Sequence, residues 1–135
     1  MDKSSQILID SNVLIGAFLP GDRLESRAND ELKRIEELSL KKIIHPLVFT
    51  ETLSILKYKG GLDLALDAKK IIENNFRVIT VFGKITPRVE KIFAKYENVG
   101  MVDAMLIDYC LVNKAELITL DTKMKEIWQK LKRKN

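Results

Sequence analysis

Four carboxylates differ from the other acidic residues because each lies where an apolar segment begins, ends or forms a stripe. Asp10 and Asp121 each directly follow a short apolar run, and Asp103 stands at the start of an almost wholly apolar segment. Glu51 falls on the apolar stripe of another segment, so we expect it to face the protein interior. Carboxylates grouped without cysteine or histidine suit Mg²⁺ or Mn²⁺, which prefer oxygen ligands.

Each carboxylate also has a purely structural interpretation. Asp10, Asp103 and Asp121 could each cap a helix, which stabilises by about 1 kcal/mol. Glu51 could favour the positive end of its helix. However, Ser, Thr or Asn serve as caps equally well, and Glu51 lies too far along its segment to be one. The four together therefore favour a binding site.

The elements that would bring these residues together alternate between strands and helices. The alternation predicts an α/β fold in three layers, α/β/α, with a short central parallel sheet of four strands, or five. In such a sheet the carboxyl ends of the strands share one edge, where ligands bind. The predicted strands are residues 7–9, 42–45, 76–82 and 116–120, and the predicted helices are a short one from 13, then 25–40, 46–58, 62–75, 86–97, 103–114 and one from 121.

Length and composition exclude several classes of protein. The 135 residues predict a single domain, 1–135, and 46% hydrophobic with 31% charged residues exclude a disordered chain. No apolar run approaches the roughly 20 residues of a membrane span, and the polar N-terminus is not typical of a signal peptide. With Cys110 as the single cysteine, we expect no internal disulfide and a cytoplasmic location. Cys110 itself is interpreted as a small core residue.

The charge distribution favours a polyanionic partner. The net charge is +4 although the four carboxylates count against it, so the rest of the protein is more basic than this value suggests. The last predicted helix is rich in lysine, and Trp128 within it is expected to pack on the sheet rather than stack on a base. Candidate phosphate contacts are Lys57, Lys59, Lys123 and Lys125.

Several catalytic classes lack their residues here. Neither a GxGxxG nor a GxxxxGK[ST] loop occurs, and His45, expected to be a turn residue beside Pro46, is the single histidine. A haloacid-dehalogenase-type phosphatase would need an Asp where Asn12 stands. A response-regulator receiver would need a phosphorylatable Asp after the third strand, where residues 82–84 offer none.

The segments ILIDSNVLIGAF, PLVFTETLSIL, VDAMLIDYCLV and LITLDTK resemble, in order and spacing, the conserved blocks of the PIN-domain nucleases, which include the VapC-type toxins. The resemblance implies an endoribonuclease that uses Mg²⁺ or Mn²⁺ and metal-activated water, leaving a 5′-phosphate and a 3′-hydroxyl. It implies Asp10, Glu51, Asp103 and Asp121 as catalytic and metal-binding residues. Asn12 and Thr119 match supporting polar positions.

Within this set, we expect Asp10 and Asp103 to bind a first ion directly, and Glu51 and Asp121 to bind a second ion or to orient water. The sequence departs from the family pattern after the last acidic block. Members commonly carry a further strand there, and many have an Asp and a Phe where this chain has Lys123 and Met124. One or two ions per site therefore remain open.

The resemblance also implies partners: RNA, an antitoxin protein and a second copy of the chain. The apolar faces of residues 53–56 and 62–66 are candidates for the homodimer contact; the alternative is an intramolecular helix pair. The alternative function is a PIN-like module that binds RNA or protein without cutting, against which four intact carboxylates argue.

Overall fold

The structure is a computed structural model that describes residues 6–80 and 84–134. Within this part of the chain, four parallel strands form one sheet in the order β3–β2–β1–β4. Leu8, at the centre of β1, lies opposite Ile43 of β2 and Leu117 of β4. The strands are β1 (Gln6–Ile9), β2 (Lys41–Ile44), β3 (Arg77–Val78) and β4 (Glu116–Ile118).

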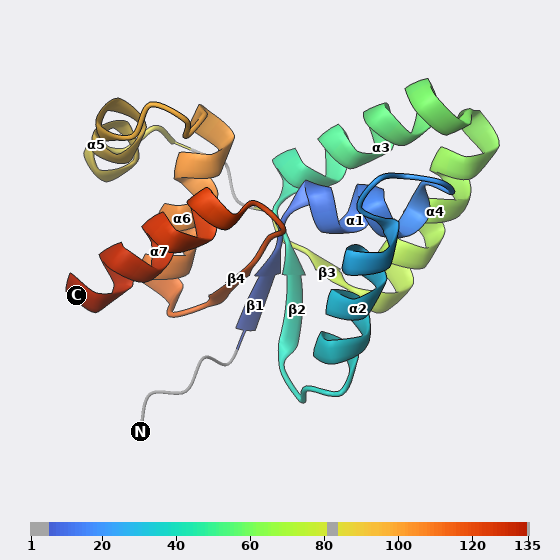
Figure 1. Ribbon diagram of the computed structural model, residues 1–135, viewed down its shortest axis with the longest axis horizontal. Coiled ribbons are helices and arrows are strands. Elements are labelled where there is room, and N and C mark those ends of the chain that lie inside the picture. Colours follow the sequence, from blue (N-terminus) through green and yellow to red (C-terminus); the bar gives the residue numbers. More distant parts are fainter. Residues whose placement is uncertain (1–5, 81–83, 135) are drawn as a thin grey trace.

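Helices cover both faces of the sheet (Figure 1). Helices α1 to α4 lie on one face and α5 to α7 on the other, so the predicted three-layer α/β/α architecture with four strands is confirmed. The helices are α1 (Ser11–Phe18), α2 (Glu25–Glu36), α3 (Pro46–Gly60), α4 (Leu62–Asn75), α5 (Pro87–Lys95), α6 (Met101–Asn113) and α7 (Thr122–Lys134).

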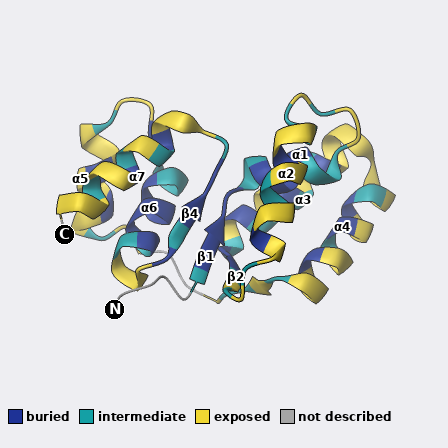
Figure 2. Cartoon of the chain, turned by 60° about the horizontal axis from the view of Figure 1, so that its bottom comes forward, coloured by how far each residue is buried: buried dark blue, intermediate teal, exposed yellow. Residues whose placement is uncertain are grey.

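The core lies between these layers, and Figure 2 shows the buried strands at its centre. Apolar residues fill β1, the inner half of β2 and most of α6. Cys110 is a buried core residue, and burial raises the pKa of its thiol. Trp128 of α7 is 4% exposed, which confirms that it packs inward. Among the described residues, no helix is both long and apolar enough to cross a membrane.

Helix α3 starts at the sheet edge because two residues favour a helix there. Pro46 occupies the first turn, where its missing N–H is not needed. His45 precedes it as the N-cap, and its Nδ1 accepts a hydrogen bond from the Leu47 N–H at 3.1 Å. The predicted turn residue is thus a helix cap, and burial lowers its pKa. At the other end, Gly61 adopts a φ of 97°, which lets the chain turn directly into α4.

Several predicted elements are too long: the strand predicted over 116–120 ends at Ile118 and the helix predicted over 86–97 ends at Lys95. The strand predicted over 76–82 contains Arg77 and Val78 as β3, because Phe76 still caps α4, and within the described residues β3 pairs with β2 alone. Residues 81–83 of that prediction lie outside the described part of the chain. The helix predicted over 25–40 ends at Glu36, after which Leu38 and Leu40 pack on the core ahead of β2.

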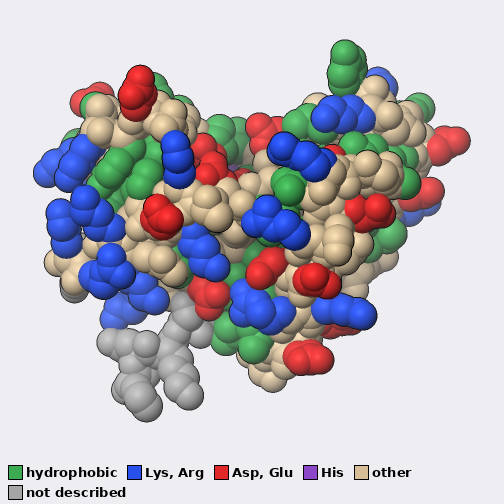
Figure 3. All heavy atoms as spheres, viewed as in Figure 1, with side chains coloured by type: hydrophobic (Ala, Val, Ile, Leu, Met, Phe, Trp, Pro, Cys, Tyr) green, Lys and Arg blue, Asp and Glu red, His purple; other side chains and the backbone are tan. Residues whose placement is uncertain are grey.

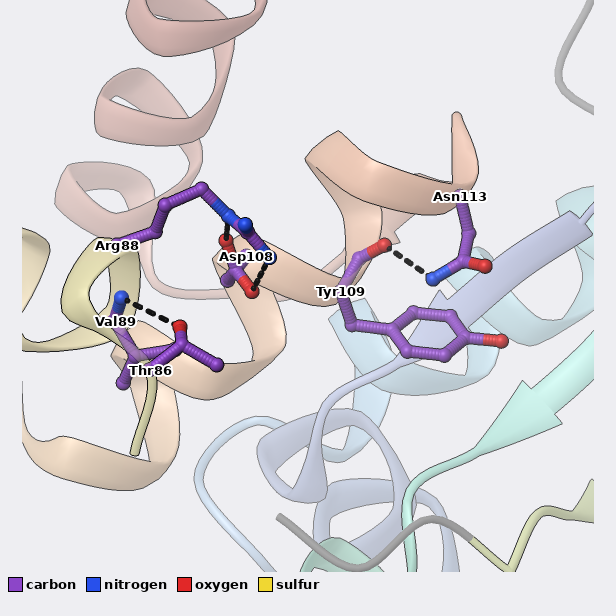
Figure 4. A network of polar contacts seen from close by, with 6 residues as sticks. All are labelled: Thr86, Arg88, Val89, Asp108, Tyr109 and Asn113. Atoms are coloured by element: carbon purple, nitrogen blue, oxygen red, sulfur yellow. Dashed lines mark hydrogen bonds and ion pairs between the residues drawn. The ribbon is translucent and has the colours of Figure 1, made fainter. Parts of the chain in front are cut away.

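An ion pair fastens α5 to α6. Asp108 is a buried residue of α6, and both of its oxygens accept hydrogen bonds from Arg88 of α5, Nε at 2.9 Å and Nη2 at 3.3 Å (Figure 4). The hydroxyl of Thr86 accepts the Val89 N–H at 3.2 Å and so caps α5. These contacts hold the two helices together on one face of the sheet.

Candidate metal-binding active site

The candidate site lies where the chain connections diverge at the carboxyl edge of the sheet. From β1 the chain proceeds to β2 on one side, whereas the connection after β3 crosses to β4 on the other side. Parallel α/β sheets bind ligands at this kind of divergence. Asp10 follows β1 and Thr119 follows β4, so residues 109 positions apart in sequence become neighbours.

The Asp10 carboxylate is held by hydrogen bonds to both of its oxygens. Asp10 caps α1, and its Oδ1 accepts the Ser11 N–H at 2.7 Å. Its Oδ2 accepts the Thr119 hydroxyl at 2.8 Å and the Asn12 amide at 3.4 Å. The side chain therefore has a fixed orientation at the end of β1, and the cap interpretation describes its geometry correctly.

The hydroxyl of Thr119 orients this group further. While donating to Asp10, it accepts hydrogen bonds from Asn12 Nδ2 and from the Asp121 N–H, both at 3.1 Å. The amide oxygen of Asn12 in turn accepts the Leu120 N–H at 3.1 Å. Asn12 and Thr119 thus tie the end of β1 to the end of β4.

The electrostatic surroundings of Asp10 are unfavourable for its charge. Asp10 is 6% exposed. Its pKa is raised overall from 3.8 to about 6: burial raises it most, hydrogen bonds from Thr119 and Ser11 lower it, and repulsion from Asp103 and Glu51 raises it further. Among the described residues no Lys, Arg or His forms an ion pair with Asp10. A bound cation would offset this cost.

Asp103 was expected to begin its helix, but α6 begins two residues earlier, at Met101, so Asp103 lies in its first turn. Its carboxylate accepts the Gly100 N–H, which satisfies a donor that the helix leaves free. It is half-buried, and burial raises its pKa, as do the charges of Asp121 and Glu51. Asp103 therefore interacts electrostatically with all three other predicted carboxylates.

Glu51 does not face the interior as its stripe predicted. It is exposed, and the buried face of α3 is formed instead by Val48, Thr52 and Leu56. The two stripes differ by about one residue, or 100° of helix rotation. Because the charge of Glu51 still acts on Asp10 and Asp103, it belongs to the solvent side of the same group.

Asp121 is exposed and caps α7, accepting the Met124 N–H on Oδ1 at 3.1 Å. Its second oxygen, Oδ2, accepts no hydrogen bond within the described residues. Its backbone is fixed by the bond to Thr119, and its charge raises the pKa of Asp103. Asp121 therefore both caps α7 and belongs to the acidic group, by which we mean Asp10, Glu51, Asp103 and Asp121.

The donor set fits a hard, hydrated cation. No three Asp, Glu, His or Cys side chains of residues 6–80 and 84–134 form a ready-made metal-binding group. Mg²⁺ needs none, because it usually keeps several waters and is bound through one or two carboxylates. Asp10 and Asp103 provide such a pair: both are withdrawn from solvent, both repel one another, and neither has a cationic partner in the described structure.

The predicted RNA-binding lysines lie in two places. Lys57 and Lys59 are exposed near the end of α3, so Lys57 is roughly 9 Å of helix rise beyond Glu51. Lys123 is exposed and Lys125 half-buried in the first turns of α7, next to Asp121. Figure 3 shows Lys and Arg side chains gathered over α5 and α7, and acidic side chains beside the dip between the two helical layers.

Two residues near these elements were missed in the sequence. Asp108 is as buried as Asp10, but the sequence gives no sign of it, because its partner Arg88 lies 20 positions away on another helix. Arg27 reaches from α2 to the β4–α7 turn, where its Nη2 donates to the Leu120 carbonyl oxygen at 3.4 Å. Its place on a charged, exposed helix resembles that of an ordinary solvated residue.

Comparison with known proteins identifies the fold. Among solved structures, the chain is similar to Mycobacterium tuberculosis VapC20, described as a toxin that cleaves the sarcin–ricin loop; the TM-score is 0.74 at 16% sequence identity. The match covers 90% of this chain and 95% of VapC20. A search of curated proteins found no match. The model of the PIN domain matches residues 7–129, from β1 into α7, so the chain belongs to the PIN domain family.

Proposed function

We propose that this chain is an Mg²⁺- or Mn²⁺-dependent endoribonuclease with Asp10, Glu51, Asp103 and Asp121 as its catalytic and metal-binding residues. Membership of the PIN family and the likeness to a VapC toxin support a nuclease. The observation that carries the proposal is Asp10, a carboxylate buried near other carboxylates that pairs with no Lys, Arg or His of the described residues. Such a group is costly unless it binds a cation.

We assign different roles to the four carboxylates according to their exposure. Asp10 and Asp103, the two withdrawn from solvent, would hold one ion directly; the exposed Glu51 and Asp121 would hold a second ion or orient water. The ion supplies neutralisation of the phosphate charge and activation of water. Asn12 and Thr119 keep the Asp10 carboxylate turned to the site. Water adds to phosphorus and the 3′-oxygen leaves, so the products carry a 5′-phosphate and a 3′-hydroxyl.

The test is cleavage of labelled single-stranded and hairpin RNA with Mg²⁺ or Mn²⁺, compared with EDTA. We expect cleavage that requires the metal and that disappears in Asp10→Asn and in Asp103→Asn. Asp67→Asn, an exposed carboxylate of α4, is the matched control and should cleave like the wild type. RNA that is bound but left intact by the wild type would instead favour the non-catalytic binding module.

Two protein partners belong to the proposal. An antitoxin is supported by the likeness to VapC20, itself a toxin. We expect that expression of the chain arrests growth and that the product of a neighbouring small gene relieves the arrest.

A homodimer is supported by Leu62 and Leu66, which stay exposed on α4 at 53% and 48%. Leu56 of the other predicted face packs within the chain against Ala65 and Ala68.

A further inference from the structure

A hollow of about 300 Å³ adjoins the candidate active site at the edge of the sheet. It is enclosed by α2, by the turn between β4 and α7, and by the first turns of α7. Arg27 enters it from α2 and Lys125 from α7, so its two cations come from opposite helical layers. Thr119, whose hydroxyl holds Asp10, also lines this hollow. None of the four candidate carboxylates lines the hollow, but Thr119 connects it to Asp10.

The lining of the hollow holds two cations, Arg27 and Lys125, and two carboxylates, Asp30 and Glu31. Within the described structure neither Arg27 nor Lys125 forms an ion pair with a carboxylate. Of the two acidic residues in the lining, Glu31 pairs instead with Arg34, at 2.9 Å, and Arg34 also lies 3.6 Å from Glu116. Arg27 and Lys125 are therefore available to bind an anion in the hollow.

The guanidinium of Arg27 is positioned before any ligand arrives. Its Nη2 bonds to the Leu120 carbonyl oxygen, which holds the group beside the residue that precedes Asp121. One such bond leaves several of the five guanidinium donors free, and their planar arrangement matches two phosphate oxygens. The flexible Lys125 adds charge from the other side of the hollow.

We propose that Arg27, together with Lys125, binds the RNA phosphate adjacent to the one that is cleaved. The inference rests on the proposed ribonuclease activity and adds to it a subsite that fixes the position of the strand. In this arrangement the scissile phosphate would lie against the four carboxylates, and its neighbour along the strand would lie in the hollow, on the other side of Thr119. Arg27 and Lys125 are binding residues in this arrangement and take no part in the chemical step.

Kinetics of Arg27→Gln and Lys125→Gln test the subsite, with Lys33→Gln, an exposed cation of α2, as the matched control. Arg27→Gln should raise KM by about tenfold or more and change kcat by less than about threefold, with Lys125→Gln smaller in the same direction. The slope of log affinity against log salt should fall by about 1 in each. Arg27→Lys should recover the salt slope but only part of KM. Lys33→Gln should match the wild type.

A neutral linkage in the substrate locates the contact. Binding is measured with proteins that carry Asp103→Asn and therefore do not cleave. When Arg27 is present, a methylphosphonate adjacent to the cleaved bond should weaken RNA binding by about tenfold. When Arg27→Gln is added, the methylphosphonate should not change the affinity, because the contact is already lost. If Arg27→Gln behaves like Lys33→Gln while the wild type cleaves RNA, the subsite is refuted and the nuclease stands. If the wild type does not cleave RNA, the proposed function itself fails.

Discussion

Two buried aspartates of this protein, Asp10 and Asp108, differ in their partners far more than in their burial. Asp10 is 6% exposed and Asp108 is 8% exposed. Asp108 receives two hydrogen bonds from the guanidinium of Arg88. Asp10 receives its bonds from a hydroxyl, an amide and a backbone N–H, all neutral, and its charged neighbours are carboxylates.

The difference separates a structural carboxylate from one that we propose to be functional. The charge of Asp108 is balanced by Arg88, so the pair holds α5 against α6. The charge of Asp10 is oriented but not balanced by a cationic side chain in the described residues, which is why we propose it as a cation ligand. Burial alone would have placed both residues in one class, and the nature of the hydrogen-bond donor distinguishes them.

The largest expected effect is on cleavage. Asp10→Asn should lower the single-turnover rate by about 10³-fold or more, because a direct ligand that stabilises transition-state charge is worth several kcal/mol. Asp108→Asn should leave the rate of the folded protein within about threefold of the wild type. Rates are normalised to the folded fraction measured by circular dichroism. Equal losses in both variants would contradict the division between the two aspartates.

In the absence of metal, Asp10→Asn and Asp108→Asn should change the stability of the protein in opposite directions. Since the pKa of Asp10 is raised from 3.8 to about 6, its ionised form opposes folding above pH 6, and this cost disappears as the pH falls below 3.8. Asp10→Asn should therefore raise the free energy of unfolding at pH 7.5 by roughly 2–3 kcal/mol, while Asp108→Asn lowers it. Urea unfolding in EDTA measures both, and the gain in Asp10→Asn should vanish near pH 4.

Metal binding should depend on pH through the same group. Protonated Asp10 competes with the ion, so the affinity for Mn²⁺ should fall by roughly tenfold per pH unit below about 6 and level off above it. Calorimetry in buffers of different ionisation enthalpy should detect proton release near pH 6. Asp108→Asn should keep this profile; a profile unchanged in Asp10→Asn would assign the proton to another group.

The smallest effects on metal binding and stability are expected from replacing Thr119, beside Asp10, and Thr86, at the start of α5. Thr119→Val removes the hydroxyl that donates to Asp10, so we expect a further rise in the Asp10 pKa and about a tenfold loss of metal affinity. Thr86→Val removes the cap of α5 and should cost about 1 kcal/mol of stability with metal affinity unchanged. Mn²⁺ titration and thermal unfolding of both variants measure the difference.

The sequence was sufficient to place the residues that follow strands. Asp10 and Asp121 each come directly after an apolar run, and parallel topology brings such positions to one edge of the sheet. The order of strands and helices was predictable for the same reason. These features depend on local patterns and on one rule of sheet topology.

Features that depend on packing were not predictable. Glu51 and Thr52 are both compatible with an apolar stripe on α3, and only the contact with the rest of the fold decides that Thr52 is buried. The Arg88–Asp108 pair requires a particular crossing of α5 and α6, which no spacing encodes. The length of β3 is likewise set by its position at the edge of the sheet, where β2 is its one neighbour among the described strands.

The pairing of β1 with β4 also determines when the site can form. Residues 7–9 pair with 116–118, so Asp10 acquires its Thr119 partner only after the 109 residues that follow it have been synthesised. A chain growing from its N-terminus at roughly 5–20 residues per second therefore carries an unassembled site until β4 has been made. The strand order thus delays the pairing of Asp10 with Thr119 during translation.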